Sequence, residues 1–165
     1  MCSSDLAIAR VDAVQPPFSA LKRQTAERIL PWAADNGAAV IVYSPMQSGL
    51  LTGAIDAARV TALPANDWRR GHEDFTGETL ERNLAVTRAL AAVGRRHGRS
   101  SGEAALAWVL GWRGVSGAIV GARSAAQVDG WVGGGDLRLD AEDFTSIAAA
   151  IEAAGAGAGP VQPAE

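Results

Sequence analysis

The sequence is poor in the residue types that most often carry chemistry. Its 165 residues include one cysteine, Cys2, which excludes an intramolecular disulfide and a multi-cysteine zinc site. It also has only two histidines, His72 and His97, one tyrosine, Tyr43, and one lysine, Lys22. The basic charge is therefore nearly all arginine, which favours fixed contacts to anions over tunable general bases. A mechanism that needs two of the scarce residue types in one site has almost no choice of residues.

The chain has neither a surplus of positive charge nor a long hydrophobic run. Fifteen Lys and Arg against 18 Asp and Glu give a net charge of −3, which argues against general binding of nucleic acid or anionic membranes. No apolar stretch approaches the roughly 20 residues of a bilayer span. The N-terminus lacks the charged and apolar regions of a signal peptide, which predicts a cytoplasmic protein. With 48% hydrophobic and 20% charged residues, the composition predicts a globular fold of roughly one domain.

Three short apolar segments are typical of buried strands. Val11–Gln15 is stopped by two prolines, Ala38–Tyr43 is uninterrupted and β-branched, and Gly117–Val120 follows a glycine turn. The composition of Ala38–Tyr43 predicts a strand covered on both faces. Helical segments separate the strands, which predicts right-handed βαβ units and a parallel sheet. Because a three-stranded parallel sheet leaves both edges bare, we expect the chain to be part of a larger α/β fold.

The helical segments carry recognisable start and stop signals. Pro31 fits only the first turn of a helix, so the helix around it should begin near Arg28. Ser100–Glu103 has the spacing of a capping box. Between the elements, Ser44–Gly77 is predicted to be long and irregular, and Gly155–Glu165 is predicted to be a fraying tail. The predicted helices are Arg28–Asn36, Thr79–His97, Gly102–Leu110, a segment from Ser124 to about Trp131, and Ala141–Ala153 capped by Asp140 or Ala141.

The histidines and tryptophans give weak functional signals. His97 lies in the last turn of a predicted helix and His72 in a charged loop, so both are expected in solvent. Neither has a ligand-like spacing to a second His or Cys, which argues against a metal site. Trp108 and Trp112 share one helix side and are expected in the core. Trp68 is the tryptophan that we expect could line a pocket.

Candidate binding residues follow the predicted strands, because ligands of parallel α/β folds bind at the carboxyl ends of the strands. After the third strand, Gly121-Ala122-Arg123-Ser124 opens a helix and presents free backbone N–H groups to an anion. Arg123 adds a forked cation that suits phosphate, and Ser124 adds a hydroxyl. The same residues also fit an ordinary turn in which Ser124 caps the helix and Arg123 is solvated.

The ends of the other two strands present an aromatic ring and an amide. Tyr43 could stack on a planar ring, donate a proton, or simply satisfy its hydroxyl at the strand end. The hydroxyls of Ser44 and Ser48 and the amides of their loop could hold a pyrophosphate. Gln15, fixed at the rim by two prolines, could recognise another amide as both donor and acceptor, although it also fits an ordinary surface position.

Four segments together resemble the C-terminal half of the aldo-keto reductases, in the bacterial branch related to the potassium-channel β subunits. They are Val14–Arg23, Tyr43–Met46 with Gly49–Gly53, Ala105–Leu110, and Ile119–Val128. The order and spacing match from about residue 7 to residue 154, so residues 1–6 are interpreted as a non-native or mis-called start and 155–165 as a flexible tail. The resemblance implies a partial (β/α)8 barrel in which this chain supplies strands six to eight with their helices.

The resemblance also implies an NADPH-dependent oxidoreductase that reduces aldehydes or ketones to alcohols. The family's catalytic Asp, Tyr, Lys and His belong to the first half of the barrel, so no catalytic residue is assigned here and the isolated chain is expected to be inactive. Gln15 would contact the nicotinamide carboxamide and Tyr43 would stack on the nicotinamide ring. Ser44, Met46, Ser48, Gly49 and Leu50 would line the pyrophosphate, and Gly121, Ala122, Arg123, Ser124 and Gln127 would hold the 2′-phosphate end, which favours NADPH over NADH.

One departure and several alternatives accompany this assignment. Gly130 and Trp131 stand where many members carry an acid and an Asn for the adenine, so Trp131 is expected to stack on that ring instead. A non-catalytic NADP(H)-binding regulatory subunit like the channel β subunits is the main alternative, and another phosphate-binding barrel is a further one. The expected partner is a small carbonyl substrate, with neither nucleic acid nor membrane, and the open sheet edges predict self-association.

Overall fold

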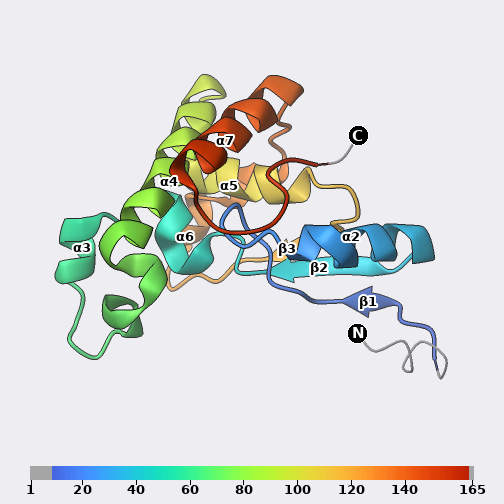
Figure 1. Ribbon diagram of the computed structural model, residues 1–165, viewed down its shortest axis with the longest axis horizontal. Helices are drawn as coiled ribbons and strands as arrows, with labels where there is room; N and C mark the ends of the chain where they lie inside the picture. The colour runs from blue at the N-terminus through green and yellow to red at the C-terminus, as the bar shows by residue number, and fades with distance from the viewer. Residues whose placement is uncertain (1–8, 164–165) are drawn as a thin grey trace.

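A parallel sheet with the strand order β1-β2-β3 organises residues 9–163, the part of the chain that the computed structural model describes (Figure 1). The strands are β1 (Ala13–Val14), β2 (Ala39–Tyr43) and β3 (Gly117–Ile119), each within two residues of the predicted bounds. Both strand pairs are parallel, so the three carboxyl ends lie at one edge of the sheet. The predicted α/β class is confirmed. The predicted non-native start, residues 1–6, lies outside the described residues.

Helices cover one face of this sheet and leave the other open (Figure 1). Along β2, Val40 and Val42 are buried, whereas Ile41 and Tyr43 are 38% and 41% exposed. Ile119 of β3 is 46% exposed. The prediction that this strand is covered on both faces is therefore wrong for this chain, because its helices pack on only one side. The hydrophobic run of β2 includes Ile41 and Tyr43, which lie on the face of the sheet that the described helices do not cover.

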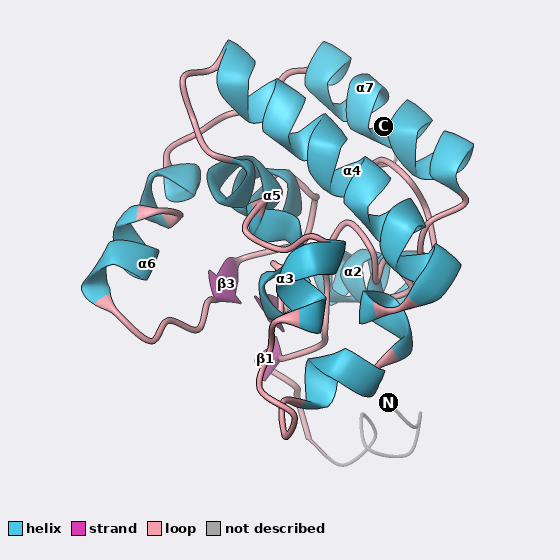
Figure 2. Cartoon of the chain, turned by 90° about the vertical axis from the view of Figure 1, so that its left-hand side faces the viewer, coloured by secondary structure: helices cyan, strands magenta, loops and turns pink. Residues whose placement is uncertain are grey.

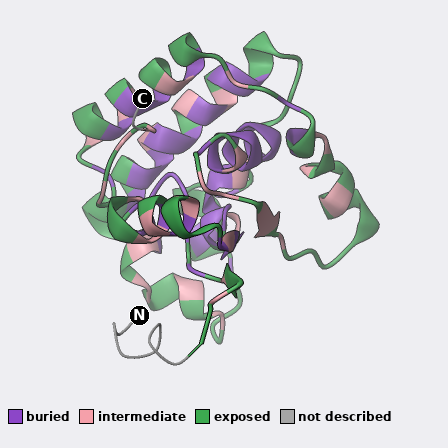
Figure 3. Cartoon of the chain, turned by 90° about the vertical axis from the view of Figure 1, so that its right-hand side faces the viewer, coloured by how far each residue is buried: buried purple, intermediate pink, exposed green. Residues whose placement is uncertain are grey.

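Five α-helices confirm the predicted helical segments. Three of them, α4 (Gly77–Arg96), α5 (Ser101–Leu110) and α7 (Ala141–Ala154), pack together above the sheet (Figure 2). The mostly aliphatic core contains an aromatic cluster: Trp108 is fully buried and stacks on Phe18 with ring centroids 5.6 Å apart, and Trp112 meets Trp108 edge-on at 5.1 Å. Figure 3 shows the buried residues gathered where the helices face one another. The five are α2 (Thr25–Asn36), α4 (Gly77–Arg96), α5 (Ser101–Leu110), α6 (Ala125–Asp129) and α7 (Ala141–Ala154).

Helix α2 begins earlier than predicted. It starts at Thr25, so Pro31 lies inside the helix and not in its first turn. A proline removes one backbone donor and leaves the carbonyl of residue 27 without its helical partner. Both Pro31 and Glu27 are exposed, so water can satisfy that carbonyl. The helix tolerates the proline because it lies on the solvent side.

The segment Ser44–Gly77 is folded, in contrast to the predicted irregular stretch. Its elements are too short to show a hydrophobic period, and two of them begin at aspartates that act as caps. Asp56 accepts a hydrogen bond from the Arg59 N–H at 2.7 Å, and Asp67 accepts one from the Arg69 N–H at 3.1 Å. The elements are η1 (Gln47–Thr52), α3 (Ala57–Thr61), η2 (Trp68–Gly71) and η3 (Glu73–Phe75); a further 3-10 turn, η4 (Val132–Gly135), follows α6.

The C-terminal segment is held against the body of the protein, in contrast to the predicted fraying tail. The buried Arg23 guanidinium donates to the carbonyls of Ala156 at 3.1 Å and Gly159 at 3.3 Å. The Arg23 N–H also donates to the Ala158 carbonyl at 2.9 Å, and burial lowers the pKa of the Arg23 side chain. Gly159, with φ +100°, lies against the Arg23 backbone, where a side chain would collide. The glycines that suggested disorder permit this close approach.

A buried carboxylate joins the end of α4 to the start of α7. Asp143 accepts hydrogen bonds from the Arg96 guanidinium, from the Asp140 N–H at 3.1 Å, and has one oxygen 2.7 Å from the His97 Nε2. Burial raises the pKa of Asp143, but the hydrogen bonds to Arg96, His97 and Asp140 outweigh it and hold the pKa below its ordinary value. His97 is exposed at the end of α4, as expected, but its imidazole also pairs with Asp143, a partner on a distant helix that the sequence did not predict.

We expect the substitution Asp143→Asn to lower the free energy of unfolding by about 2 kcal/mol at pH 7, because it removes a charged acceptor from two basic groups. The depressed pKa means that the carboxylate stabilises the fold above pH about 4, and that this contribution is lost as the pH falls through the folded-state pKa. Urea denaturation at several pH values measures it. Glu142→Gln, in the same turn but exposed, is the control and should change little. A deficit of Asp143→Asn that persists unchanged below pH 3 would contradict the assignment.

Candidate functional site

The carboxyl ends of the three strands lie side by side, as the sequence predicts. The Tyr43 N–H donates to the Pro16 carbonyl at 3.1 Å, and the Tyr43 carbonyl accepts from the Phe18 N–H at 3.1 Å. On the other side Tyr43 lies opposite Ile119, two positions before Gly121. The chain after β1, the end of β2 and the start of the glycine turn after β3 therefore form one continuous rim.

Gln15 and Tyr43 share the open face of the sheet. The pairings Val14–Val40 and Pro17–Tyr43 keep one register, which places Gln15 beside Ile41. Side chains of a strand alternate between faces, so those of residues 15, 41 and 43 fall on the same side. The Tyr43 ring and the Gln15 amide are both exposed on this side, where a planar group could stack on the ring and another amide could pair with the glutamine.

The loop after β2 has an unusual backbone. Three non-glycine residues adopt left-handed conformations, Ser44 with φ 55°, Gln47 with φ 45° and Ser48 with φ 54°. Such conformations cost L-residues roughly 1–2 kcal/mol each, so other contacts must hold the loop in this shape. The conformation leaves Ser44 and Ser48 exposed at the rim. Strain of this kind often accompanies binding sites.

The predicted pyrophosphate residues divide into two groups. Ser44, Ser48 and half-buried Gly49 reach the surface. Met46 and Leu50 are buried at 6% and 0% exposure, so their side chains belong to the core and only their backbones could meet a ligand. The Gly49 N–H already donates to the Met46 carbonyl at 3.1 Å. The loop therefore offers hydroxyls more clearly than free amides.

Gln47 is the anchor of this loop, and the sequence analysis missed it. Its buried side chain accepts a hydrogen bond from the Ser19 hydroxyl at 3.3 Å and donates to the Asp74 carboxylate at 2.9 Å. The Lys22 ammonium lies 3.9 Å from the same carboxylate. His72, expected in solvent, is half-buried, and its Nδ1 accepts from the Asp74 N–H at 3.2 Å. These contacts tie the segments after β1 and β2 together.

Two hydroxyls from the helices fix the other end of the loop. Thr87 of α4 donates to the Leu50 carbonyl at 3.2 Å. Ser101 of α5 donates to the Leu51 carbonyl at 2.8 Å. Both hydroxyls are buried, so water does not compete with these bonds. Their partners lie 37 and 50 residues away along the chain, and no local pattern reports such pairs.

The turn after β3 is exposed and held mainly by local contacts. The Ser124 hydroxyl accepts from the Gln127 N–H at 3.4 Å, which is the N-cap of α6. The Gln127 side chain accepts from the Arg123 N–H at 2.7 Å. The plain turn that the sequence allowed is thus present, and Gly121, Ala122 and the Arg123 guanidinium face solvent. An anion at this turn would meet the exposed Arg123 guanidinium and the hydroxyl and amide donors around it.

An ion pair in the segment between the two loops approaches both of them. Arg69 binds Asp67 in a fork, with N···O distances of 3.0 and 2.7 Å, and one of its nitrogens lies 3.5 Å from the Ser48 carbonyl. The hydrogen bond from Arg69 lowers the pKa of Asp67 to about 2, and the positive charge of Arg123 contributes in the same direction. Arg69 therefore joins this segment to the rim at Ser48, and the charge of Arg123 acts on the pair from the turn after β3.

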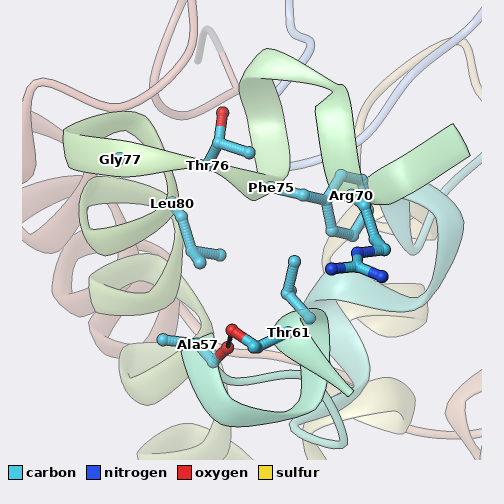
Figure 4. Close-up of a pocket in the computed structure, with 8 residues that line it drawn as sticks. Ala57, Thr61, Arg70, Phe75, Thr76, Gly77 and Leu80 are labelled. Carbon is cyan, nitrogen blue, oxygen red and sulfur yellow. Dashed lines mark hydrogen bonds between the residues drawn. The ribbon is translucent and has the colours of Figure 1, made fainter. Parts of the chain in front are cut away.

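A cavity of about 280 Å³ lies outward from the strand ends, between α3, η3 and the first turn of α4 (Figure 4). Its lining includes Phe75, Leu80 and Arg70, whose guanidinium donates to the Leu63 carbonyl at 3.3 Å. None of the predicted cofactor residues lines it, and neither does Trp68, which is 57% exposed and contacts His72 and Phe75 edge-on. The expectation that Trp68 lines a pocket is not met by this cavity.

Within residues 9–163, no group of three or more His, Cys, Asp or Glu side chains has the arrangement of a metal site. None of the described helices is both long and apolar enough to cross a membrane. The candidate site is therefore the rim formed by the three strand ends.

Comparison with known proteins points to one family. The model of the aldo/keto reductase family matches residues 3–152. The chain is 28% identical to the aldo-keto reductase YhdN of Bacillus subtilis over 153 residues, which cover 88% of this chain and 44% of that protein. It is 29% identical to the NADH-specific methylglyoxal reductase of Escherichia coli over 150 residues, 90% of this chain and 44% of the relative. The chain thus spans less than half the length of these relatives.

A solved structure resembles almost the whole chain. The glycerol dehydrogenase AKR11B4 from Gluconobacter oxydans superposes with a TM-score of 0.81 and 28% sequence identity. The similarity covers 97% of this chain and 47% of that structure. The described sheet and helices are therefore those of about half of that neighbour.

We expect Ser48→Gly to raise the free energy of unfolding by about 0.5–1 kcal/mol, because glycine adopts the left-handed conformation of this position without strain. The adjacent substitution Gly49→Ala is the matched control and should lower the free energy of unfolding. Alanine is strained at φ +92°, although no atom lies within 4 Å of its methyl group. Urea denaturation of both variants measures the difference. A loss of stability in Ser48→Gly would show that the serine side chain itself helps to maintain the strained backbone, and that the contacts of Gln47, Thr87 and Ser101 do not suffice.

Proposed function

The chain belongs to the aldo/keto reductase family, and we propose that its strand-end rim binds the nicotinamide dinucleotide of a carbonyl reductase, with NADPH preferred over NADH. The observation that carries this proposal is the register of the sheet. It places Gln15 and Tyr43 on one open face, and it places the end of β2 beside the end of β3, where Arg123 follows. An extended ligand lying along this rim would meet an aromatic ring, then hydroxyls, then a cation.

We further propose that the described sheet is a part of a (β/α)8 barrel, with β1, β2 and β3 as its last three strands. The superposition on AKR11B4 over 97% of the chain supports this. The open face of the sheet supports it as well, because the interior of such a barrel is filled by side chains from every strand. Ile41, Tyr43 and Ile119 are the residues that would lie there.

The residues at the nicotinamide end suit a planar ring with a carboxamide. The Gln15 amide can donate to and accept from the carboxamide, which fixes the rotation of the ring. The Tyr43 ring, exposed beside it, gives the nicotinamide a stacking surface and so fixes which of its faces points away from the protein. The bound dinucleotide would supply the hydride, and the residues of this chain would orient it.

The middle and far ends suit the phosphates. The exposed hydroxyls of Ser44 and Ser48 lie on a loop whose shape is held by buried hydrogen bonds, so they are preorganised for a pyrophosphate. Arg123 carries a forked, permanently charged group that suits a phosphate at the adenosine 2′ position. This supports a preference for NADPH, even though one relative is named as NADH-specific. Trp131, half-buried next to this turn, is the residue proposed for the adenine.

We expect this chain to bind NADPH more tightly than NADH, as measured by quenching of its tryptophan fluorescence. Arg123→Gln should weaken NADPH binding by about tenfold and leave NADH binding unchanged, because only NADPH carries the extra phosphate. Arg113→Gln is the matched control, because Arg113 is also exposed but follows the C-terminal end of α5, outside the candidate site. Failure of the chain to bind either dinucleotide would refute the proposal, and equal loss of both in Arg123→Gln would refute the role of Arg123.

We expect no aldehyde-dependent oxidation of NADPH by the 165-residue chain, because the proposal assigns its one tyrosine to stacking and leaves it without a proton donor. Tyr43→Phe keeps a ring and should bind NADPH with nearly unchanged affinity, whereas Tyr43→Ala should bind more weakly. The absorbance of the reduced nicotinamide measures turnover. A rate above background that Tyr43→Phe abolishes would make Tyr43 a proton donor and contradict this assignment.

A further inference from the structure

The N-cap and the first residue of α5 contact the loop after β2 and the end of α6, the short helix that follows the glycine turn after β3. The Ser100 hydroxyl donates to the Gly130 carbonyl at 2.7 Å, in the segment after β3. The Ser101 hydroxyl donates to the Leu51 carbonyl at 2.8 Å, in the loop after β2. One peptide unit of the helix thus separates the two attachment points.

The next residue, Gly102, lies where the two loops meet. A Cβ atom at this position would lie 3.4 Å from the Gly130 carbonyl oxygen, 3.7 Å from the Met46 sulfur and 3.7 Å from the Trp131 Cβ. Met46 belongs to the loop after β2, and Gly130 and Trp131 directly follow α6, in the segment that begins with the glycine turn after β3. A methyl group therefore fits in ordinary contact, whereas a longer side chain would push the loops apart.

The turn itself is rigid enough to act as a reference point. Ser100 and Glu103 form a capping box, with the Glu103 N–H donating to the Ser100 hydroxyl at 3.0 Å and the Ser100 N–H donating to the Glu103 carboxylate at 2.7 Å. Arg99 also donates to this carboxylate at 3.0 Å. Burial raises the pKa of Glu103, but the hydrogen bonds to Ser100 and Arg99 outweigh it and lower the pKa. Gly133 packs directly on this pair, where a side chain would collide.

We propose that Ser100, Ser101 and Gly102 are positioning residues that set the distance between the two cofactor loops, so that one dinucleotide can engage both at once. This inference rests on the proposed function. A dinucleotide is a two-ended ligand, and its affinity exceeds that of either end alone only when the spacing of the two subsites matches its length. The first turn of α5 supplies that spacing because it bonds to both loops.

A two-ended and a one-ended ligand together test this role. NADPH requires both loops, whereas 2′,5′-ADP requires only the loop after β3. Gly102→Leu should weaken NADPH binding at least about tenfold more than it weakens 2′,5′-ADP binding, because the leucine approaches Trp131 in both cases but changes the spacing of the loops, on which only NADPH depends. Gly102→Ala should bind both ligands like the wild type. Gly135→Leu, at an exposed glycine with no atom within 4 Å, is the matched control for adding a leucine, and should bind both ligands like the wild type.

Substitutions of the neighbouring serine give a second, milder test that does not add volume. Ser101→Ala releases the Leu51 carbonyl and should weaken NADPH binding several-fold with 2′,5′-ADP binding unchanged, and Ser101→Thr, which keeps the hydroxyl, should restore it. Thermal unfolding midpoints identify variants that fail to fold. Equal losses for both ligands, or no loss for NADPH in folded Gly102→Leu or Ser101→Ala, would overturn the inference while leaving the proposed function intact. A wild-type chain that binds 2′,5′-ADP and NADPH with equal affinity would also overturn it, and one that binds neither would overturn the proposed function itself.

Discussion

The backbone pairing of Tyr43 with both neighbouring strands is the constraint on which the site depends. Its N–H and carbonyl bond to the segment after β1, and its position opposite Ile119 aligns the end of β2 with the end of β3. If this register slipped by one residue, every side chain of β2 would change face, and Tyr43 would point into the helical core. Val40 and Val42, fully buried on the other face, prevent the slip because they would then be exposed. The burial of two valines therefore determines where the tyrosine ring lies.

Much of the fold could be predicted from local signals. The three strands, five helices and the cap of α7 at Asp140 follow from hydrophobic period, β-branched runs and capping patterns. The features that were missed or predicted wrongly depend on contacts between distant residues. His97 pairs with Asp143, and Arg23 binds the carbonyl of Ala156 in the C-terminal segment. In each case the partner lies far along the chain, so the local sequence does not predict the contact. Pro31 shows a different limit of prediction from sequence. A proline inside a helix is tolerated here because the carbonyl that loses its partner faces solvent, and the sequence around Pro31 does not show which side of the helix that is.

The site was predicted in the same uneven way. Its surface residues, Gln15, Tyr43 and Arg123, follow strand ends, so position along the chain was enough to identify them as candidates. The residues that give the site its shape are buried polar groups, Gln47 and Ser101 among them, and these are ordinary in the sequence. Buried hydrogen bonds of this type hold a strained backbone because breaking one leaves an unpaired group in the interior, at a cost of about 1–3 kcal/mol. The left-handed conformations of Ser44, Gln47 and Ser48 together store about 3–6 kcal/mol of strain, so several such bonds are needed to hold the loop, and the side chains of Gln47, Thr87 and Ser101 supply them.

The two loops differ in how firmly they are held, and this difference has a consequence for selectivity. The loop after β2 is bonded from the segment after β1, from α4 and from α5, so a ligand there would meet groups already in place. The turn after β3 is exposed from Gly121 to Gln127 and has mainly its own cap to hold it. A ligand that orders side chains such as Arg123 must offset their conformational entropy, about 1–2 kcal/mol for a long side chain. The contact between Arg123 and a phosphate must exceed this cost to discriminate between dinucleotides. The bond from Ser100 to Gly130 fixes the end of α6, the helix that follows this turn, so under the proposed function a helix cap would reduce this cost and contribute to selectivity at an arginine that it does not touch.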